Sequence, residues 1–223
     1  VIKFVKYLIN FTNLINFINS HMIEKLEKML ICRGEDEERL YAEAKEIKNQ
    51  TIGNKVYLRG LIEISNICTK DCFYCGIRKS NTETARYALS DEEILEAADF
   101  AYTHRFGSIV LQGGERSDRE FTERITRLLK EIKKNSNNEL GITLSLGEQT
   151  EDTYKRWFDA GAHRYLLRIE TSNPELYAKI HPNNALHSHA TRLKCLERLQ
   201  RTGYQTNRSH DWSSLSDHHR FGK

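Results

Sequence analysis

The stretch Ile67-Cys-Thr-Lys-Asp-Cys-Phe-Tyr-Cys-Gly76 decides the fold class, because its three cysteines stand in C-x-x-x-C-x-x-C spacing directly after a predicted strand. A structural zinc site takes four protein ligands in a closed tetrahedron. A cubane 4Fe–4S cluster also normally takes four thiolates. Cys68, Cys72 and Cys75 can instead hold three irons of such a cluster and leave the fourth iron open. An open iron can bind a small molecule and pass it an electron.

Two other interpretations of these cysteines stay open. A zinc site would need a fourth ligand from Cys32, Cys195 or a histidine. A disulfide is disfavoured because the chain has five cysteines, an odd number, and shows no secretory signal with a cleavage site. Cys195 falls beside Leu193 and Leu196 in a predicted helix, so we expect it to be packed as a small hydrophobic residue.

The composition fits one soluble α/β domain. The chain has 223 residues, of which 39% are hydrophobic, 34 are basic and 31 are acidic. Its net charge of +3 is too small to argue for nucleic acid or a membrane surface. We therefore expect neither a nucleic-acid partner nor a membrane partner.

Helical and strand-like patterns alternate along the chain. Helices are expected at 23–30 and 35–49, and strands at 56–65, 108–112, 141–146 and 163–169. Helices are also expected after the strands. Three of them cover 118–134, 150–160 and 188–202. Two more are expected from their start signals, one at the cap Ser90 and one at Asn173-Pro174.

Four strand–helix alternations predict a parallel sheet with right-handed crossovers. Each predicted strand ends in a polar or glycine-rich loop, and in a β/α barrel these loops make the active site. A full barrel needs about 250 residues, so residues 56–206 hold roughly half of one, the first four βα units. Residues 22–55 form an N-terminal helical segment before it. Half a barrel is expected to leave the outer edge of the fourth strand unpaired.

The first 21 residues differ from the rest, because they contain no acidic residue and have Asn at positions 10, 13, 16 and 19. Repeated Asn is costly in lipid, which disfavours a membrane anchor. An amphipathic helix at a membrane surface is a second interpretation. We expect residues 1–21 to be translated upstream sequence, with the natural start at Met22.

Four stretches together resemble one family of radical S-adenosylmethionine (SAM) enzymes, the FeFe-hydrogenase maturases of the HydE type. They are Arg59-Gly-Leu-Ile-Glu-Ile-Ser-Asn66, Val110-Leu-Gln-Gly-Gly-Glu115, Thr143-Leu-Ser-Leu-Gly-Glu148 and Arg164-Tyr-Leu-Leu-Arg-Ile-Glu-Thr-Ser-Asn-Pro174. Biotin synthase and methylornithine synthase are relatives of that family. The resemblance covers about residues 22–206. It implies a TIM-type radical SAM barrel, of which 56–206 is a part.

The resemblance implies two cofactors, a 4Fe–4S cluster and SAM. Cys68, Cys72 and Cys75 resemble the cluster ligands, and Tyr74 resembles an aromatic residue that lies against the adenine or packs the cluster loop. Gly113, Gly114 and Glu115 resemble the motif that receives the amino group of SAM. Glu170 and Arg192 are expected by the same resemblance to contact SAM, Arg192 through the methionine carboxylate.

The chemistry of these residue types suits SAM. Gly113 and Gly114 let backbone carbonyls come close, and Glu115 offers an anionic partner to an ammonium group, although a simple turn explains a Gly-Gly-Glu run equally well. The guanidinium of Arg192 suits a carboxylate. A solvated helix face is the alternative for Arg192, and extra residues near 183–189 loosen the match there.

Three further residues resemble the substrate cavity of the maturase. Arg164 and Arg168 alternate with Tyr165 and Leu167, which would point both arginines into the barrel lumen, and Thr143 lies on the lumen side by the same logic. Arginines in a lumen imply an anionic guest. Ion pairs with Glu148 or Glu170 are the alternative. Together with Glu170, these three residues are the candidate catalytic set.

The resemblance also implies a function. The reduced cluster would cleave SAM to methionine and a 5′-deoxyadenosyl radical, which would act on a cysteine-bound iron–carbonyl–cyanide precursor during assembly of the hydrogenase diiron site. Such an enzyme is cytoplasmic and works with other maturation proteins and a low-potential electron donor. Two alternatives are a relative acting on a carbon substrate and an inactive fragment that binds an iron–sulfur cluster.

Residues 207–223 have no periodicity and no resemblance to the family. There the family continues with a glycine-rich fifth strand. One back-translation of these residues, read one base later, contains Gly-Leu-Pro-Phe-Gln-Thr, which the family would require. We therefore expect 207–223 to be an out-of-frame tail after a small insertion or deletion near codons 206–207.

Overall fold

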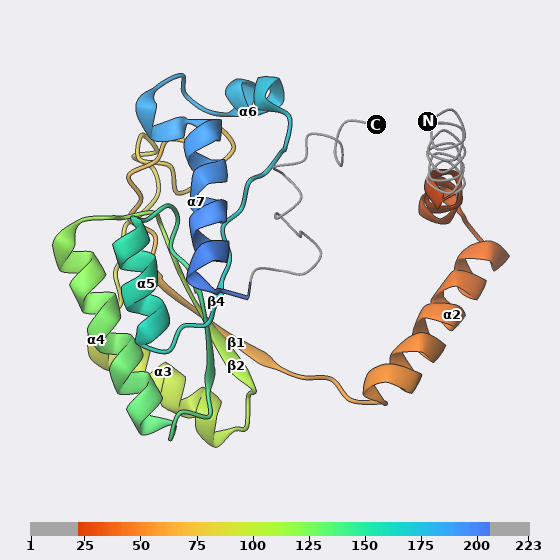
Figure 1. Cartoon of the computed structure of the whole chain (residues 1–223), viewed down its shortest axis with the longest axis horizontal. Coiled ribbons are helices and arrows are strands. Elements are labelled where there is room, and N and C mark those ends of the chain that lie inside the picture. Colours follow the sequence, from red (N-terminus) through yellow and green to blue (C-terminus); the bar gives the residue numbers. More distant parts are fainter. Residues whose placement is uncertain (1–21, 206–223) are drawn as a thin grey trace, which may run out of the picture. The chain divides into compact units, whose positions relative to one another are not determined.

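The computed structural model describes residues 22–205 of the chain, so the expectations for 1–21 and 207–223 lie outside the described residues. The chain divides into two compact units between Val56 and Tyr57. In the first unit, residues 22–31 are helical and α2 spans Glu35–Ile52 (Figure 1). The first turn of α2 is acidic, which suits the partial positive charge of a helix N-terminus.

The second unit contains a parallel sheet in the order β1-β2-β3-β4. Its strands are β1 (Arg59–Ser65), β2 (Ser108–Gly113), β3 (Gly141–Ser145) and β4 (Arg164–Tyr165). The helices between and after them are α3 (Asp91–Thr103), α4 (Arg119–Asn135), α5 (Glu151–Asp159), α6 (Pro174–Ile180), the short 3₁₀ helix η1 (Ala185–His187) and α7 (His189–Thr202). Because each strand pairs with the next in the chain, the topology is that of the first half of a β/α barrel.

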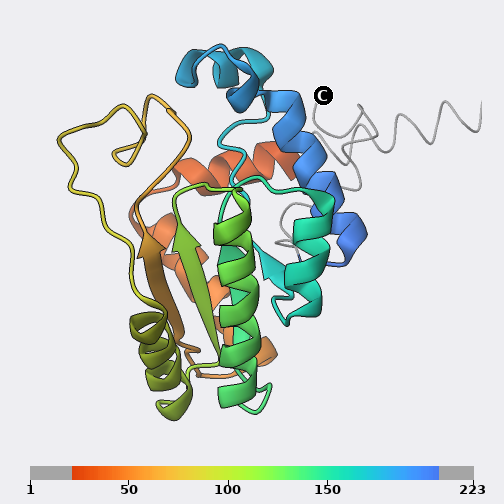
Figure 2. The ribbon, with the colours of Figure 1, turned by 90° about the vertical axis from the view of Figure 1, so that its left-hand side faces the viewer.

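The core lies between one face of the sheet and α3, α4 and α5, which run along that face (Figure 2). One row of register-paired residues is buried there: Ile62, Leu111, Leu144 and Tyr165. The preceding row lies on the opposite face of the sheet: Leu61, Val110, Thr143 and Arg164. That second face corresponds to the lumen side of a barrel.

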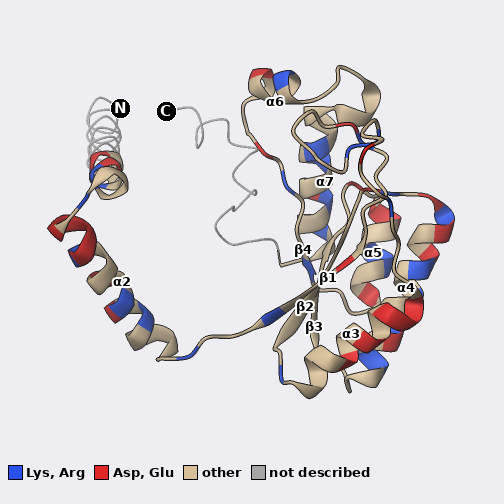
Figure 3. Cartoon of the chain, turned by 180° about the vertical axis from the view of Figure 1, so that it is seen from behind, with Lys and Arg blue, Asp and Glu red and all other residues tan. Residues whose placement is uncertain are grey.

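Helix α4 illustrates how the helices cover the sheet. Its apolar residues, Ile125, Leu128, Leu129 and Ile132 among them, are buried at helical spacing. Acidic and basic residues also recur along α3 and α4 (Figure 3). Among residues 22–205, no helix is long and apolar enough to cross a membrane.

The predicted helix starts are confirmed. Ser90 accepts a hydrogen bond from the backbone of Glu93, and the side chain of Glu93 accepts one from the backbone of Ser90, which makes a capping box. Asn173 caps α6 ahead of Pro174. These contacts join residues a few positions apart, so each helix start is set locally.

The fourth strand is shorter than predicted. The sequence predicts a strand over 163–169, but β4 is Arg164–Tyr165. One further bond, from Leu166 N to Leu144 O at 2.7 Å, ends the ladder with β3. Glu170 then adopts a φ of 65°, a left-handed conformation that an extended strand does not contain.

The prediction that the outer edge of β4 is unpaired is wrong at one position. Gln205 forms a parallel bridge with Arg164, and its backbone N–H donates to the carbonyl of His163 at 2.9 Å. The chain has returned along α7 to the edge of the sheet at this residue. The turn depends on Gly203, whose φ of 97° ends α7.

Candidate functional site

Cys68, Cys72 and Cys75 lie on the loop between β1 and α3, and all three are partly exposed free thiols. The sulfur of Cys68 accepts backbone N–H groups from Lys70 at 3.4 Å and from Glu115 at 3.3 Å. These two contacts fix the Cys68 sulfur between its own loop and the segment that follows β2.

The arrangement suits a cluster better than a single ion. Within residues 22–205, no three His, Cys, Asp or Glu side chains converge as ligands of one metal ion. A 4Fe–4S cluster does not require such convergence, because each thiolate binds its own iron. Burial raises the pKa of Cys72, and the neighbouring Cys75 and Cys68 raise it further. A bound cation would offset the cost of a negative charge on Cys72. Cys195, one candidate for a fourth zinc ligand, is buried in α7.

The Gly113-Gly114-Glu115 turn runs directly against the cysteine loop. Gly114 N donates to Ser65 O at 3.0 Å, and Thr69 N donates to Glu115 O at 2.9 Å. A Cβ on Gly114 would lie 2.3 Å from the carbonyl oxygen of Ile67, a distance that real Cβ atoms do not adopt. Gly114 is therefore required by the close approach of two backbones.

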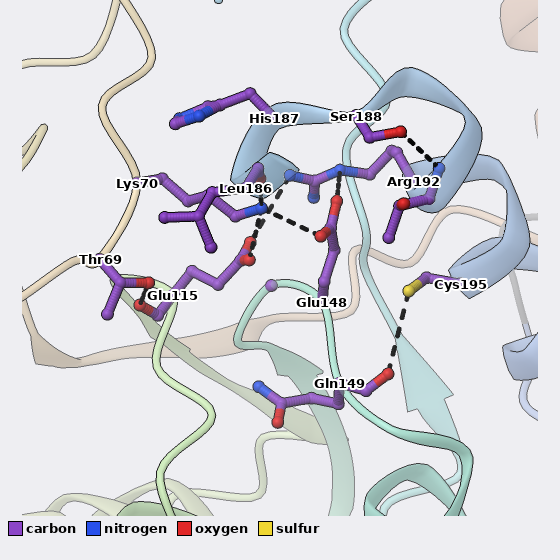
Figure 4. Close-up of polar contacts among 12 residues, drawn as sticks. Thr69, Lys70, Glu115, Glu148, Gln149, Leu186, His187, Ser188, Arg192 and Cys195 are labelled. Carbon is purple, nitrogen blue, oxygen red and sulfur yellow. Dashed lines mark hydrogen bonds and ion pairs between the residues drawn. The ribbon is translucent and has the colours of Figure 1, made fainter. Parts of the chain in front are cut away.

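Four buried charged side chains meet beside this turn, and we call them the charge quartet: Lys70, Glu115, Glu148 and Arg192 (Figure 4). Lys70 Nζ lies 3.1 Å from Glu115 Oε1 and 3.0 Å from Glu148 Oε2. Arg192 Nη2 lies 3.5 Å from Glu115 Oε2, and Arg192 Nε lies 2.8 Å from Glu148 Oε1. The last contact is an ion pair whose angles are not those of a hydrogen bond.

Each member of the charge quartet comes from a different part of the fold. Lys70 belongs to the cysteine loop, Glu115 follows β2, Glu148 follows β3, and Arg192 belongs to α7. Their side chains are between 6% and 12% exposed, so little water screens the charges. The site therefore lies at the carboxyl ends of the strands, where β/α barrels place their active sites.

The charges of the quartet balance, with two cations and two carboxylates. Burial opposes charge on Lys70, but Glu115 and Glu148 outweigh it and raise the pKa of Lys70. Burial raises the pKa of Glu115, although Arg192 and Lys70 act in the opposite direction. Because each cation contacts both carboxylates, loss of one member would leave another buried charge without a full complement of partners.

The predicted SAM residues are brought together only in part. Gly113, Gly114, Glu115 and Arg192 meet around the cysteine loop, and Arg192 is buried rather than on a solvated helix face. Tyr74 is exposed on the cysteine loop, with its hydroxyl 3.3 Å from His181 Nε2. Burial raises the pKa of Tyr74, and the nearby Cys72 raises it further.

The remaining predicted residues lie outside the quartet. Arg164 is exposed, and its Nε donates to Gln205 Oε1 at 3.1 Å. Arg168 is exposed, with Nη2 3.5 Å from Gln112 Oε1, and Glu170 is also exposed. In the part of the chain that the structure describes, neither arginine forms the ion pair with a glutamate that was the alternative explanation.

Thr143 lies in the same register row as Arg164, on the face of the sheet away from the helices. Its side chain is buried, and its Oγ1 has no hydrogen-bond partner. A buried hydroxyl without a partner is costly unless a ligand or water satisfies it. This face can therefore accept a polar group.

Sequence reasoning missed Lys70 and Gly147 and treated Glu148 only as a counter-ion for the arginines. Gly147 has a φ of 75°, and a Cβ there would lie 2.2 Å from Glu115 Cγ. The Gly147-Glu148 loop thus packs against Glu115. The available signals were the position of Lys70 between two cysteines and the Gly-Glu ending of the third strand.

Comparisons with known proteins agree with this geometry. The family model described as "Radical SAM superfamily" matches residues 62–210. The chain is 42% identical over 169 residues to the [FeFe] hydrogenase maturase subunit HydE of Thermotoga maritima, covering 76% of this chain and 47% of that protein. It is 34% identical over 161 residues to the biotin synthase of Macrococcus caseolyticus, covering 70% of this chain and 48% of that protein.

Among solved structures, methylornithine synthase (PylB) superposes with a TM-score of 0.69 at 28% identity, covering 80% of this chain and 51% of that one. The fold is thus that of radical SAM barrels. The chain spans about half the length of the curated relatives it matches.

Proposed function

Because the chain belongs to the radical SAM superfamily, whose members use a 4Fe–4S cluster and SAM, we propose that its cysteine loop and charge quartet form the cofactor site of a HydE-type hydrogenase maturase. One observation carries the proposal. Glu115 and Arg192, assigned from separate motifs to the ammonium and the carboxylate of the same methionine group, approach each other to 3.5 Å (Arg192 Nη2 to Glu115 Oε2) beside the cysteine loop.

Different residues of the chain would bind the cluster and SAM. Cys68, Cys72 and Cys75 would bind three irons, and Glu115 and Arg192 would bind the ammonium and the carboxylate of SAM. An amino-acid zwitterion fits a site of two cations and two carboxylates, because it brings one charge of each sign. When bound and reduced, the cofactors supply the 5′-deoxyadenosyl radical.

The substrate would lie on the open face of the sheet. Thr143, Arg164, Arg168 and Glu170 would form its cavity, and the partnerless hydroxyl of Thr143 supports a polar guest. The exposed arginines favour an anion. The organometallic iron precursor that the HydE resemblance implies would satisfy both conditions.

This role implies further partners: other hydrogenase maturation proteins and a low-potential electron donor. A related enzyme acting on a carbon substrate is the second candidate, supported by the similarity to biotin synthase and methylornithine synthase. A third candidate is a fragment that binds a cluster without cleaving SAM.

The test begins with anaerobic reconstitution of the purified chain with iron and sulfide. We expect about four irons per chain and the spectrum of a 4Fe–4S cluster. Cys72→Ala should lose the cluster, whereas Cys32→Ala, outside the predicted ligand set, should keep it. Equal iron binding by both variants would contradict the cysteine assignment.

The second step adds SAM and a strong reductant and measures 5′-deoxyadenosine and methionine. Their formation supports a radical SAM enzyme, whereas a cluster without these products supports the fragment. Addition of the chain to an apo-hydrogenase maturation mixture lacking HydE then separates the two enzymatic candidates, since restored hydrogenase activity is expected only of the maturase.

A further inference from the structure

The segment formed by residues 180–187 lies against the cysteine loop, and we call it the strap. It accepts three hydrogen bonds from residues that stand between Cys68 and Cys75. Phe73 N donates to Ile180 O at 3.1 Å, Asp71 N donates to His187 Nε2 at 2.9 Å, and Lys70 Nζ donates to Leu186 O. The strap thus contacts the loop at most of the positions that separate the predicted cluster ligands.

The strap also has an internal framework that fixes His187. Asn184 Oδ1 accepts a hydrogen bond from Leu186 N at 3.1 Å and lies 2.8 Å from His187 Nδ1. The backbone N–H of His187 donates to Asn184 O at 3.1 Å, and the side chain of His187 belongs to a residue only 6% exposed. These partners orient the imidazole without help from solvent.

The partners of His187 also decide its tautomer. An amide N–H can only donate, so Nε2 accepts the hydrogen bond of Asp71. Nδ1 therefore carries the proton, which it donates to the Asn184 oxygen. His187 is a neutral imidazole with both nitrogens engaged.

Lys70 shows how the strap reaches the charge quartet. An ammonium group has three N–H donors. Lys70 has three acceptors: Glu115, Glu148 and the carbonyl of Leu186. The strap therefore supplies the third acceptor of the Lys70 ammonium group, which holds Lys70 between the two carboxylates.

We propose that His187 is a positioning residue for the cysteine loop, and that the strap sets the cluster ligands and the charge quartet in place together. The extra residues near 183–189, which interrupt the resemblance to the maturases, would have this role. The proposal rests on the proposed function in one respect, namely that the cysteine loop holds a cluster.

The loss of the His187 acceptor has a calculable cost. The hydrogen bond from Asp71 N to His187 Nε2 is partly buried, and a donor that loses its partner there changes an opening equilibrium by about tenfold. His187→Leu should therefore open the cysteine loop. His187→Gln should restore it, because an amide oxygen can accept at the position of Nε2.

The first measurement is amide hydrogen exchange of the peptide that spans 67–76, in the purified chain without a cluster. We expect exchange about tenfold faster in His187→Leu and close to wild type in His187→Gln. His163→Leu is the matched control, because His163 is exposed and contacts Phe158 of α5 instead of the loop. Unchanged exchange in His187→Leu would overturn the proposal.

The second measurement is iron release to a chelator, with the EPR spectrum of the reduced cluster, on the reconstituted variants. His187→Leu should release iron about tenfold faster with an altered spectrum, and His187→Gln should match wild type. Equal rates in His187→Leu and His163→Leu would overturn the link to the cluster. If no variant takes up iron, the proposed function fails, while the exchange measurement still decides whether the strap holds the loop.

Discussion

Replacement of Gly114 by alanine should damage the site more than any other change of one methyl group in the cysteine region. The new Cβ would lie 2.3 Å from Ile67 O, 2.6 Å from Ile67 C and 2.9 Å from Cys68 Cα. All three are backbone atoms, so no side-chain rotation relieves the clash. Real Cβ atoms essentially never lie closer than 3.0 Å to such an atom. The two backbones would therefore have to separate by about 0.7 Å to bring the distance from the new Cβ to Ile67 O up to that limit.

The expected loss of stability in Gly114→Ala follows from the contacts that this separation would disrupt. Overpacking a well-packed site costs about 1–3 kcal/mol, and we expect the upper end because backbone must move. The bonds from Gly114 N to Ser65 O and from Thr69 N to Glu115 O would lengthen together. A displacement of about 1 Å in a reactive site can also lower its rate about 100-fold.

The assay compares Gly114→Ala with Gly76→Ala, in the same loop region. Nothing lies within 4 Å of a Cβ on Gly76, and Gly76 does not have a positive φ. Urea denaturation should show a loss of about 3 kcal/mol for Gly114→Ala and a change of at most about 1 kcal/mol for Gly76→Ala. Iron uptake should fall only in the first variant. Equal stability and equal iron uptake in the two variants would refute the argument from backbone approach.

Three other predictions concern charge, capping and pH. Glu148→Gln should lower the free energy of unfolding by about 3 kcal/mol, because it leaves two buried cations with one carboxylate. The control is Glu151→Gln, which breaks the exposed ion pair with Arg201. In the same urea titration it should change the free energy of unfolding by less than about 1 kcal/mol. Ser90→Ala should cost about 1 kcal/mol by removing the cap bond from Glu93 N, and an unchanged thermal midpoint would contradict this. Burial raises the pKa of three tyrosines: Tyr154, Tyr165 and Tyr204. Above about pH 10 the unfolded chain loses these protons while the folded chain keeps them, so stability should fall with rising pH. Tyrosinate absorbance equal to that of all ten tyrosines, reached before the helical signal is lost, would contradict this.

The elements that the sequence predicts well are those set by nearby residues. The start of α3 depends on Ser90 and Glu93, which lie within one turn of each other, and the end of α7 depends on Gly203. The length of β4 could not be predicted in this way. It depends on where the ladder with β3 ends, and a partner strand elsewhere in the chain decides that.

The same distinction applies to the candidate site. The cysteines lie in one short motif, so their grouping follows from spacing. Lys70 and Glu148 are 78 positions apart, and two loops that the sequence does not position bring them together. Resemblance singled out Glu115 and Arg192, but nothing in the sequence indicated that Lys70 joins them.

The order of the strands has a consequence for biosynthesis. Because each strand pairs with its predecessor, most of the sheet can assemble progressively while the chain emerges from the ribosome. The charge quartet cannot assemble progressively in the same way. Lys70 is synthesised early, whereas Arg192 belongs to α7, the last described helix. A nascent chain that has reached α5 would hold two carboxylates over a lone lysine, and synthesis of α7 supplies the cation that completes the site.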